Sequence, residues 1–359
     1  MNAKTTVQRL LDAADISING SQPCDIQVQE DRFYRRVLSQ PVLGLGESYM
    51  DGWWECEALD QFMDRVLRAG LKQQVKNSLQ FQWQVMKAKL LNLQSRGRAE
   101  KSGKYHYDKG NQLYEAMLDS RMNYSCAYWA AADNLDDAQK AKLDLICRKL
   151  ELEEGMTVLD LGCGYGSFAE YAAENYGAHV TGVTVSEGQY EWFQKHHDDA
   201  LPVEIEIEDY RQVEGRYDRV LSIGFFEHVG VKNYPTYMEV VDRSLKDDGI
   251  SLIHSIGSNV SMVAINPWTA KYIFPNSMLP SVRQIGDAME EYFVMEDWHN
   301  FGPDYDKTLM QWYANFENAW PELKEDYSER FRRMWRYYLL TSAAGFRGRA
   351  PPQPAALAL

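Results

Sequence analysis

The chain has 359 residues, of which 45% are hydrophobic and 25% charged, a composition typical of a folded globular protein rather than a disordered one. Its length predicts two structural units, since domains usually hold about 100–200 residues. The formal net charge of −14 argues against nucleic acid as a partner.

Two further features bear on where the protein works. No apolar run reaches the roughly 18 residues needed to span a bilayer, and residues 1–11 lack the apolar core of a secretion signal. The cysteines are scattered, without metal-ligand spacing, at Cys24, Cys56, Cys126, Cys147 and Cys163. They are typical of free thiols, so we expect a reducing cytoplasm and no metal site.

The first 92 residues combine short extended runs with helical patterning. Residues 15–20 and 25–29 alternate apolar and polar side chains, which predicts two half-buried strands. Residues 44–54 are rich in glycine and end in aromatic residues that we expect in the core. From Leu59 to about residue 93, apolar residues recur at helical spacing, with a break at Gly70. The pattern predicts a small N-terminal α+β domain over residues 1–92.

Positive charge is concentrated in residues 65–104, which hold ten lysines and arginines against the single carboxylate of Glu100, a net charge of +9. A basic amphipathic segment on an acidic protein favours attraction to anionic lipid headgroups. A solvated helix face explains the same charges equally well. We place a basic linker at residues 93–104.

Beyond this linker, strands and helices alternate. Strands are expected at residues 156–161, 179–184, 203–207, 219–223 and 250–255, and helices at 136–150, 167–174, 187–197 and 234–245. This order predicts a doubly wound, mostly parallel α/β sheet with right-handed crossovers, and we assign residues 105–346 to it. We expect residues 347–359, rich in proline and alanine, to be a disordered tail without a strand, because proline removes ladder donors.

The first strand of this sheet runs into a glycine-rich turn. Asp160 precedes Gly162, Gly164 and Gly166, which recur at alternate positions before a helical run. A dinucleotide site would read G-x-G-x-x-G with an acid about 20 residues later, and a P-loop would add Lys-Ser/Thr. The turn instead suits a cofactor without phosphates, such as S-adenosylmethionine (SAM), whose ammonium group Asp160 would orient. A tight turn without a ligand is the alternative.

The ends of the next two strands supply further candidates. The second strand ends without the acidic residue that usually holds a ribose, so Thr184 and Gln189 would provide neutral hydrogen bonds. Asp209, just past the third strand and beside Tyr210, would accept a hydrogen bond from an adenine amino group.

Glu227 follows the fourth strand and His254 ends the fifth, so we expect both at the carboxyl edge, where such sheets bind ligands. A carboxylate and an imidazole at one site can bind or relay a proton, although each is also a common structural residue. Cys126 lies in an aromatic segment, and no Cys-His-Asn arrangement accompanies it. We therefore expect its backbone, rather than its sulfur, to matter.

Together, several motifs resemble the family of cyclopropane and mycolic acid cyclopropane synthases. They lie at residues 45–55, 106–111, 124–129, 159–166, 226–230, 267–281 and 297–312. The resemblance extends over about residues 31–346, and the N-terminal part is similar to members that carry a lipid-binding domain.

This resemblance implies SAM-dependent methyl transfer to a cis double bond of a phospholipid acyl chain, followed by proton loss and closure to a cyclopropane. In the family a bound bicarbonate ion is thought to take the proton, and the matching positions are the backbones of Cys126 and Ile256 and the side chains of Glu227, His254 and Tyr305. The same matching places SAM against Tyr124, Ser125, Gly162, Gly164, Thr184, Gln189, Asp209 and Tyr210.

The resemblance also implies a cytoplasmic enzyme that is peripheral on the inner membrane leaflet, binds an anionic phospholipid surface and dimerises through its N-terminal domain. Two alternatives stay open: a SAM methyltransferase that makes a methyl-branched lipid or acts on a small molecule, and an inactive lipid-binding homologue. The inactive alternative rests on two departures from the family. Ser342 replaces a cysteine, and the chain ends without the usual apolar strand.

Overall fold

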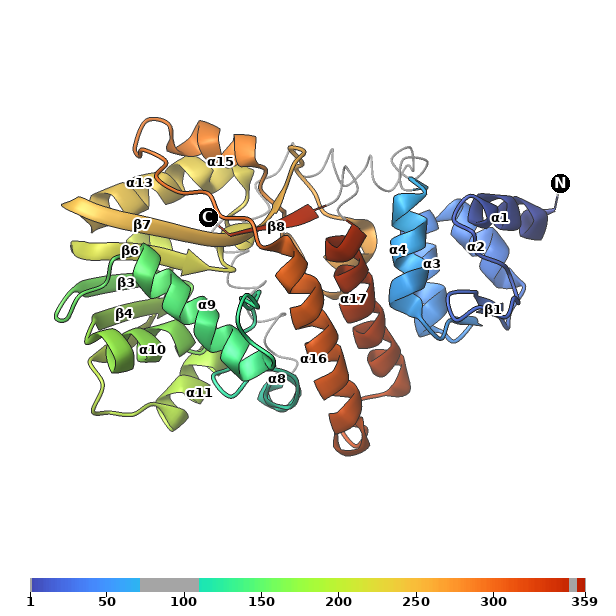
Figure 1. Ribbon diagram of the computed structural model, residues 1–359, viewed down its shortest axis with the longest axis horizontal. Coiled ribbons are helices and arrows are strands. Elements are labelled where there is room, and N and C mark those ends of the chain that lie inside the picture. Colours follow the sequence, from blue (N-terminus) through green and yellow to red (C-terminus); the bar gives the residue numbers. More distant parts are fainter. Residues whose placement is uncertain (1, 72–109, 349–353, 359) are drawn as a thin grey trace.

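Figure 1 shows the computed structural model, which describes residues 2–71, 110–348 and 354–358. At its centre is a six-stranded sheet in the order β5-β4-β3-β6-β7-β8. The strands are β3 (Thr157–Leu161), β4 (His179–Thr184), β5 (Val203–Ile207), β6 (Tyr217–Ile223), β7 (Leu245–Ser258) and β8 (Pro354–Ala358). Neighbours from β5 to β7 pair in parallel, and β8 pairs antiparallel with β7. The predicted doubly wound, mostly parallel sheet is confirmed.

Helices cover both faces of the sheet (Figure 1). They include α9 (Leu135–Lys149), α10 (Ser167–Tyr176), α11 (Glu187–His196), α12 (Phe226–Val229), α13 (Tyr234–Ser244) and α15 (Val282–Met289). Successive side chains of a strand point to opposite faces. Val158 therefore belongs to the core beneath α9 and α10, whereas Leu159 belongs to the core beneath α13 and α15. Both side chains are fully buried, as expected for a parallel strand covered on both sides.

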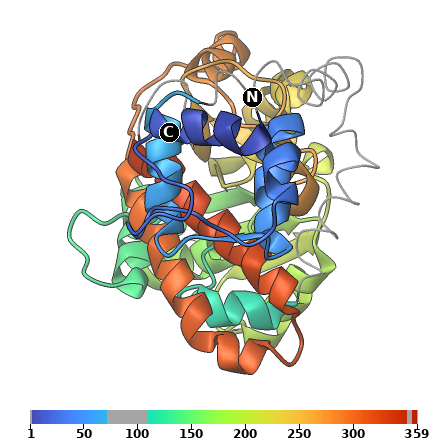
Figure 2. The same cartoon turned by 90° about the vertical axis from the view of Figure 1, so that its right-hand side faces the viewer.

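A long antiparallel helix pair separates this sheet from the N-terminal helices (Figures 1 and 2). The pair is α16 (Gly302–Leu323) and α17 (Glu329–Gly348). The N-terminal elements are α1 (Ala3–Asp12), β1 (Gln27–Val28), α2 (Arg32–Ser39), α3 (Pro41–Met50), β2 (Trp54–Glu55) and α4 (Leu59–Arg68). Shorter helices elsewhere are α8 (Asn111–Met117), η1 (Tyr210–Gln212), η2 (Val231–Asn233) and α14 (Pro267–Tyr272). One core cluster joins Trp54 and Phe62 of the N-terminal part to Trp312 and Trp335 of the helix pair.

The prediction of strands at residues 15–20 and 25–29 is largely wrong. The extended pairing there consists of an isolated bridge between Ile18 and Ile26 and the two residues of β1. The reason is the carboxylate of Asp25, which accepts from the backbone N–H of Ser17 at 2.7 Å and of Gln22 at 2.8 Å. A side chain that satisfies backbone donors in this way takes the place of a strand ladder.

Gly44 and Gly46 lie inside α3, where they allow close packing. A Cβ atom on Gly44 would lie 2.7 Å from the carbonyl oxygen of Arg36, and one on Gly46 would lie 2.4 Å from the indole of Trp268. The predicted helix from Leu59 is observed as α4. The basic segment beyond residue 71, and with it the linker at 93–104, lies outside the described residues.

The expectation that residues 347–359 contain no strand is wrong. Helix α17 continues to Gly348, and β8 pairs with β7 from His254↔Ala358 to Ser258↔Pro354. Proline is acceptable as the first residue of an edge strand. In addition, its partner Ser258 donates its N–H to the carbonyl of Pro280 at 2.7 Å, away from β8. The missing proline donor therefore costs no bond between the two strands.

Candidate functional site

The glycine turn has the backbone that its sequence predicts. Gly162, Gly164 and Gly166 all have positive φ angles, of 82°, 59° and 82°. A Cβ atom on Gly162 would lie 2.3 Å from the ring of Phe225, and one on Gly166 would lie 2.6 Å from Phe193. Gly164 faces open space, with only the amide of Gln189 at 3.9 Å from an added Cβ. Two of the glycines thus permit tight packing, and the third leaves room for a ligand.

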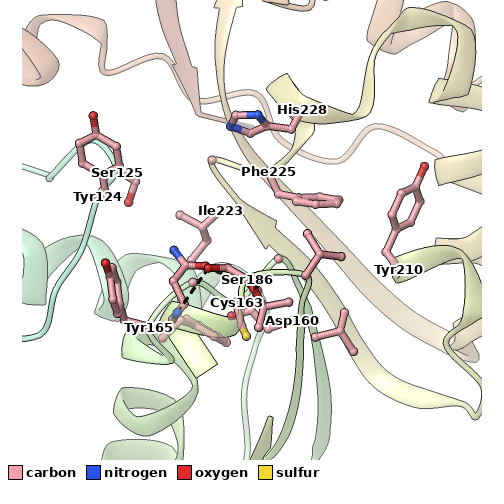
Figure 3. Close-up of a pocket in the computed structure, with 18 of the residues that line it drawn as sticks. Tyr124, Ser125, Asp160, Cys163, Tyr165, Ser186, Tyr210, Ile223, Phe225 and His228 are labelled. Atoms are coloured by element: carbon pink, nitrogen blue, oxygen red, sulfur yellow. Dashed lines mark hydrogen bonds between the residues drawn. The ribbon is translucent and has the colours of Figure 1, made fainter. Parts of the chain in front are cut away.

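A cavity opens above this turn at the carboxyl edge of the sheet (Figure 3). We call it the cofactor cavity. Of the predicted cofactor residues it is lined by Tyr124, Ser125, Asp160, Gly162, Gly164, Thr184, Gln189, Asp209 and Tyr210. Gly166 does not line it, because it packs against Phe193 at the start of α10. Figure 3 shows Asp160 at the base, with Tyr124 and Ser125 on one side and Tyr210 on the other.

Asp160 is the acidic group at the base of the cofactor cavity. Burial raises the pKa of its carboxyl to about 7, against a lowering effect from Lys142. Its Oδ1 atom has no hydrogen-bond partner among the described residues. A buried, unpartnered carboxylate oxygen fits the ammonium group of SAM, because that group would supply both the missing donor and a compensating charge.

Arg211 lines the cavity beside Asp209 and is a residue that the sequence reasoning missed. Asp209 accepts from Nε of Arg211 at 2.7 Å and from the Arg211 backbone N–H at 3.1 Å, and a second guanidinium nitrogen contacts its other oxygen. Arg211 lies two residues after Asp209, and this short separation in the sequence could have indicated the ion pair. Nearby, Thr184 donates to Oε1 of Gln189 at 3.3 Å, so these two predicted ribose candidates already contact each other.

The five remaining candidates, Cys126, Glu227, His254, Ile256 and Tyr305, are buried or half-buried behind the cofactor cavity rather than lining it. We call them the Glu227 cluster. Ile256 donates its backbone N–H to Oε1 of Glu227 at 2.7 Å. His254 lies two residues before Ile256 on β7. Burial raises the pKa of the Tyr305 hydroxyl well above its usual value, and Tyr338, Cys126 and Glu227 raise it further. Their neighbours Ser125 and His228 line the cavity, so the two sites adjoin.

Burial controls the protonation of this cluster. It raises the pKa of Glu227 to about 7, although the hydrogen bond from Ile256 opposes this effect. It lowers the pKa of His254 to about 3, so the imidazole is neutral near pH 7. Glu227 Oε2 and His254 Nδ1 have no hydrogen-bond partner within the described part of the chain. The two atoms therefore offer unused hydrogen-bonding capacity to a small ligand.

Burial also raises the pKa of the Cys126 thiol well above its usual value. A thiol that stays protonated is a poor nucleophile, which agrees with the expectation that the sulfur is not used.

Aromatic rings enclose the space between the cavity and the helix pair. The hydroxyls of Tyr124 and Tyr338 lie 3.0 Å apart. The ring of Tyr124 also lies 5.1 Å from Trp312, 6.4 Å from Phe274 and 5.2 Å from Tyr114. The sequence did not show which of its many aromatic residues gather here, because they come from segments as far as 214 residues apart.

The sheet, the glycine turn and the unpartnered acid at its base define the class of this protein: it is a SAM-dependent transferase. No helix among the described residues is both long and apolar enough to cross a bilayer.

Comparison with known proteins narrows this class. Residues 94–351 match the family described as mycolic acid cyclopropane synthetase. The chain is 55% identical over 340 residues to the cyclopropane-fatty-acyl-phospholipid synthase of Escherichia coli K12, an alignment that covers 95% of this chain and 89% of that protein. The chain belongs to the mycolic acid cyclopropane synthetase family, and the resemblance seen in its motifs is confirmed.

Solved structures agree with this assignment. The cyclopropane synthase MmaA2 from Mycobacterium tuberculosis superposes with a TM-score of 0.66 at 28% identity, covering 72% of this chain and 98% of that one. The mycolic acid cyclopropane synthase CmaA1, solved with SAH and CTAB, gives the same TM-score and identity and covers 72% and 96%.

Proposed function

We propose that this protein transfers a methylene group from SAM to cis double bonds in the acyl chains of membrane phospholipids and so forms cyclopropane fatty acids. The observation that carries the proposal is the adjacency of two sites: a cavity suited to SAM, and a buried acid–imidazole cluster enclosed by aromatic rings. The E. coli relative, whose name states this activity, supports the choice of substrate.

The reaction begins with attack of the alkene on the methyl group of the sulfonium. The sulfur–carbon bond breaks, a carbon–carbon bond forms, and a carbocation remains on the chain. Loss of a proton from the transferred methyl then supplies the electron pair that closes the ring. An alkene is a weak nucleophile and water would trap the cation, so the site must exclude water. The rings around Tyr124 suit this task, because their faces attract positive charge.

The residues of the Glu227 cluster fit a small oxyanion such as bicarbonate, which would supply the base for this proton. Within residues 2–71 and 110–348, Glu227 Oε2 and His254 Nδ1 have no hydrogen-bond partner, and Tyr305 interacts electrostatically with Glu227. We assign the holding of the anion to Glu227, His254 and Tyr305 with the backbones of Cys126 and Ile256. A Glu227 that is still protonated near pH 7 can donate to an anion, whereas an ionised one would repel it.

The membrane side of the proposal rests on charge and on the family. We propose that residues 1–92 form a lipid-binding and dimerisation domain, joined by the basic linker at 93–104 to the SAM-dependent domain at 105–346. The net charge of +9 over residues 65–104 would attract the anionic inner leaflet from the cytoplasm. The enzyme would then act as a peripheral homodimer that takes acyl chains from the bilayer.

The proposal is tested by incubating the protein with SAM, bicarbonate and vesicles of cis-unsaturated phospholipid and then analysing the acyl chains. We expect a product heavier by one methylene, without a double bond and without a methyl branch. Anionic vesicles should support faster turnover than zwitterionic ones, and added salt should remove the difference. A methyl-branched chain would replace the proposal with a lipid methyltransferase. Vesicle binding without turnover would indicate an inactive lipid-binding homologue, and SAM turnover with small acceptors alone would exclude a lipid substrate.

A further inference from the structure

Lys142 is a buried cation for which the reaction described above has no use. It lies on α9, its residue is 1% exposed, and its side chain lines the cofactor cavity. Its Nζ atom donates to Oδ1 of Asn123 at 2.6 Å and to Oγ of Ser125 at 3.2 Å. These two partners are neutral, so they satisfy hydrogen bonds without neutralising the charge. An ammonium has three donors, and within the described residues two of them are used in this way.

The charge of Lys142 is directed at the base of the cavity. It acts on Asp119, which accepts a hydrogen bond from the Asn123 side chain at 2.8 Å, and on Asp160, whose Oδ1 atom has no partner in the described part of the chain. Among the described residues, the cavity lining contains one other lysine or arginine, Arg211, and that residue is paired with Asp209. Ser125, the partner of Lys142, and Tyr210, the neighbour of Arg211, lie on opposite sides of the cavity (Figure 3). Lys142 is therefore the cation on the Ser125 side of the cavity, and its charge acts on Asp160 at the base.

The chemistry of the cofactor gives this cation a ligand. The methionyl end of SAM carries its ammonium and its carboxylate on the same carbon, so the two groups are held a few ångströms apart. If Asp160 takes the ammonium, the carboxylate must lie beside Asp160 and needs a donor there. A buried carboxylate without a cationic or strongly donating partner would be costly.

We infer that Lys142 binds the carboxylate of the SAM methionyl group. Lys142 and Asp160 then carry opposite charges that bind the carboxylate and the ammonium of this group, respectively. The inference rests on the proposed function in one respect, that the cofactor cavity holds SAM. Helix α9 would then bind the cofactor directly, in addition to the glycine turn after β3.

Binding of SAM and of decarboxylated SAM, which lacks only the carboxylate, tests this inference. The dissociation constants are measured by isothermal titration for the wild type and for Lys142→Met. The wild type should prefer SAM by about 10- to 100-fold, the range expected for a charge-assisted hydrogen bond. Lys142→Met should lose this preference by binding SAM more weakly while binding decarboxylated SAM about as well as before. Lys140→Met, on the exposed side of the same helix, should keep it.

The outcomes distinguish a failure of the proposed SAM site from a failure of the role inferred for Lys142. If the wild type binds neither compound, the proposed SAM site itself fails. If the wild type binds both equally, or if Lys142→Met weakens both by the same factor, Lys142 only holds the segment from Asn123 to Ser125 and the inference is overturned. Because the readout is a ratio within one variant, a general loosening of that segment cancels. Should Lys142→Met fail to fold, Lys142→Arg keeps the charge and must retain most of the preference, and a complete loss there would also overturn the inference.

Discussion

The cofactor cavity and the Glu227 cluster adjoin each other but are built in different ways. The cavity is formed largely by turns that directly follow β3, β4 and β5, so each contributing segment carries its own local signal. The Glu227 cluster takes residues from segments as far apart as Cys126 and Tyr305, and burial changes the ionisation of its groups. Because the two sites use different residues, we expect mutations that change the affinity for SAM to differ from mutations that change proton transfer.

Glu227→Gln is expected to have the largest effect, a loss of turnover without a loss of SAM affinity. Glutamine keeps the shape of the side chain and can still accept the Ile256 N–H, but it cannot exchange a proton. Turnover should fall by about 100- to 10,000-fold, the usual worth of a positioned acid or base, while the SAM dissociation constant stays within a factor of two. Initial rates and titration calorimetry check the two parts, with exposed Glu239→Gln as control. Near-normal turnover would remove Glu227 from the mechanism.

Gly162→Ala is expected to weaken SAM binding, because it changes the cofactor cavity rather than the Glu227 cluster. The alanine would have to adopt the positive φ angle of Gly162, which is unfavourable for a residue with a Cβ. The new Cβ would also collide with Phe225, so the turn must shift. The free energy of unfolding should fall by about 2–4 kcal/mol, and SAM should bind at least about 10-fold more weakly. Gly188→Ala has open space around it inside α11 and should be neutral or slightly stabilising. Unchanged SAM affinity in a folded Gly162→Ala variant would mean that the turn does not hold the cofactor.

A pH profile of the KM for bicarbonate sharpens the comparison, because this constant depends on the Glu227 cluster, whereas Asp160, whose pKa is also raised to about 7, would affect SAM binding. The raised pKa of Glu227 keeps it protonated below about pH 7, where it can donate to an anion. As the pH rises through that value the group ionises and repels the anion. The KM for bicarbonate, expressed as the concentration of the HCO3− ion present at each pH, should then increase about tenfold per pH unit. Glu227→Gln should flatten the profile, and a KM that is constant from pH 6 to 9 in the wild type would contradict the assignment.

The smallest effect is expected away from both sites, at Glu47. This buried carboxylate of α3 accepts from Nζ of Lys271 at 2.6 Å and from the hydroxyl of Tyr272 at 2.8 Å, and it also pairs with Arg36. Because Lys271 is half exposed, solvent screening reduces the worth of the pair. Glu47→Gln should lower the free energy of unfolding by about 1–2 kcal/mol, measured by urea denaturation, without changing SAM affinity. Exposed Glu57→Gln is the control, and a loss of SAM affinity would show that α3 supports the cavity after all.

Much of the cofactor cavity could be predicted from the sequence. The turn from Asp160 to Gly166, and the polar residues after the next two strands, were read correctly as lining or shaping a cavity. Lys142 was not found in this way. On α9 it resembles any lysine of a solvated helix, although its helical spacing from Ala138 and Ile146 places it on the buried face.

The errors were made where one strong local signal was read without its surroundings. The prolines before β8 were taken to exclude a strand, but the backbone of Ser258 already faces away from that edge. The alternation at residues 15–20 predicted a strand, but Asp25 closes a turn there.

By itself, the sequence determined the doubly wound sheet, the glycine turn and the family, because hydrophobic period, turn chemistry and motif spacing act over a few neighbouring residues. Only the tertiary structure decided which aromatic rings surround Tyr124, which carboxyl and imidazole are left unpartnered, and where Lys142 directs its charge. These properties depend on burial and on contacts between distant segments, and both arise only when the chain is packed.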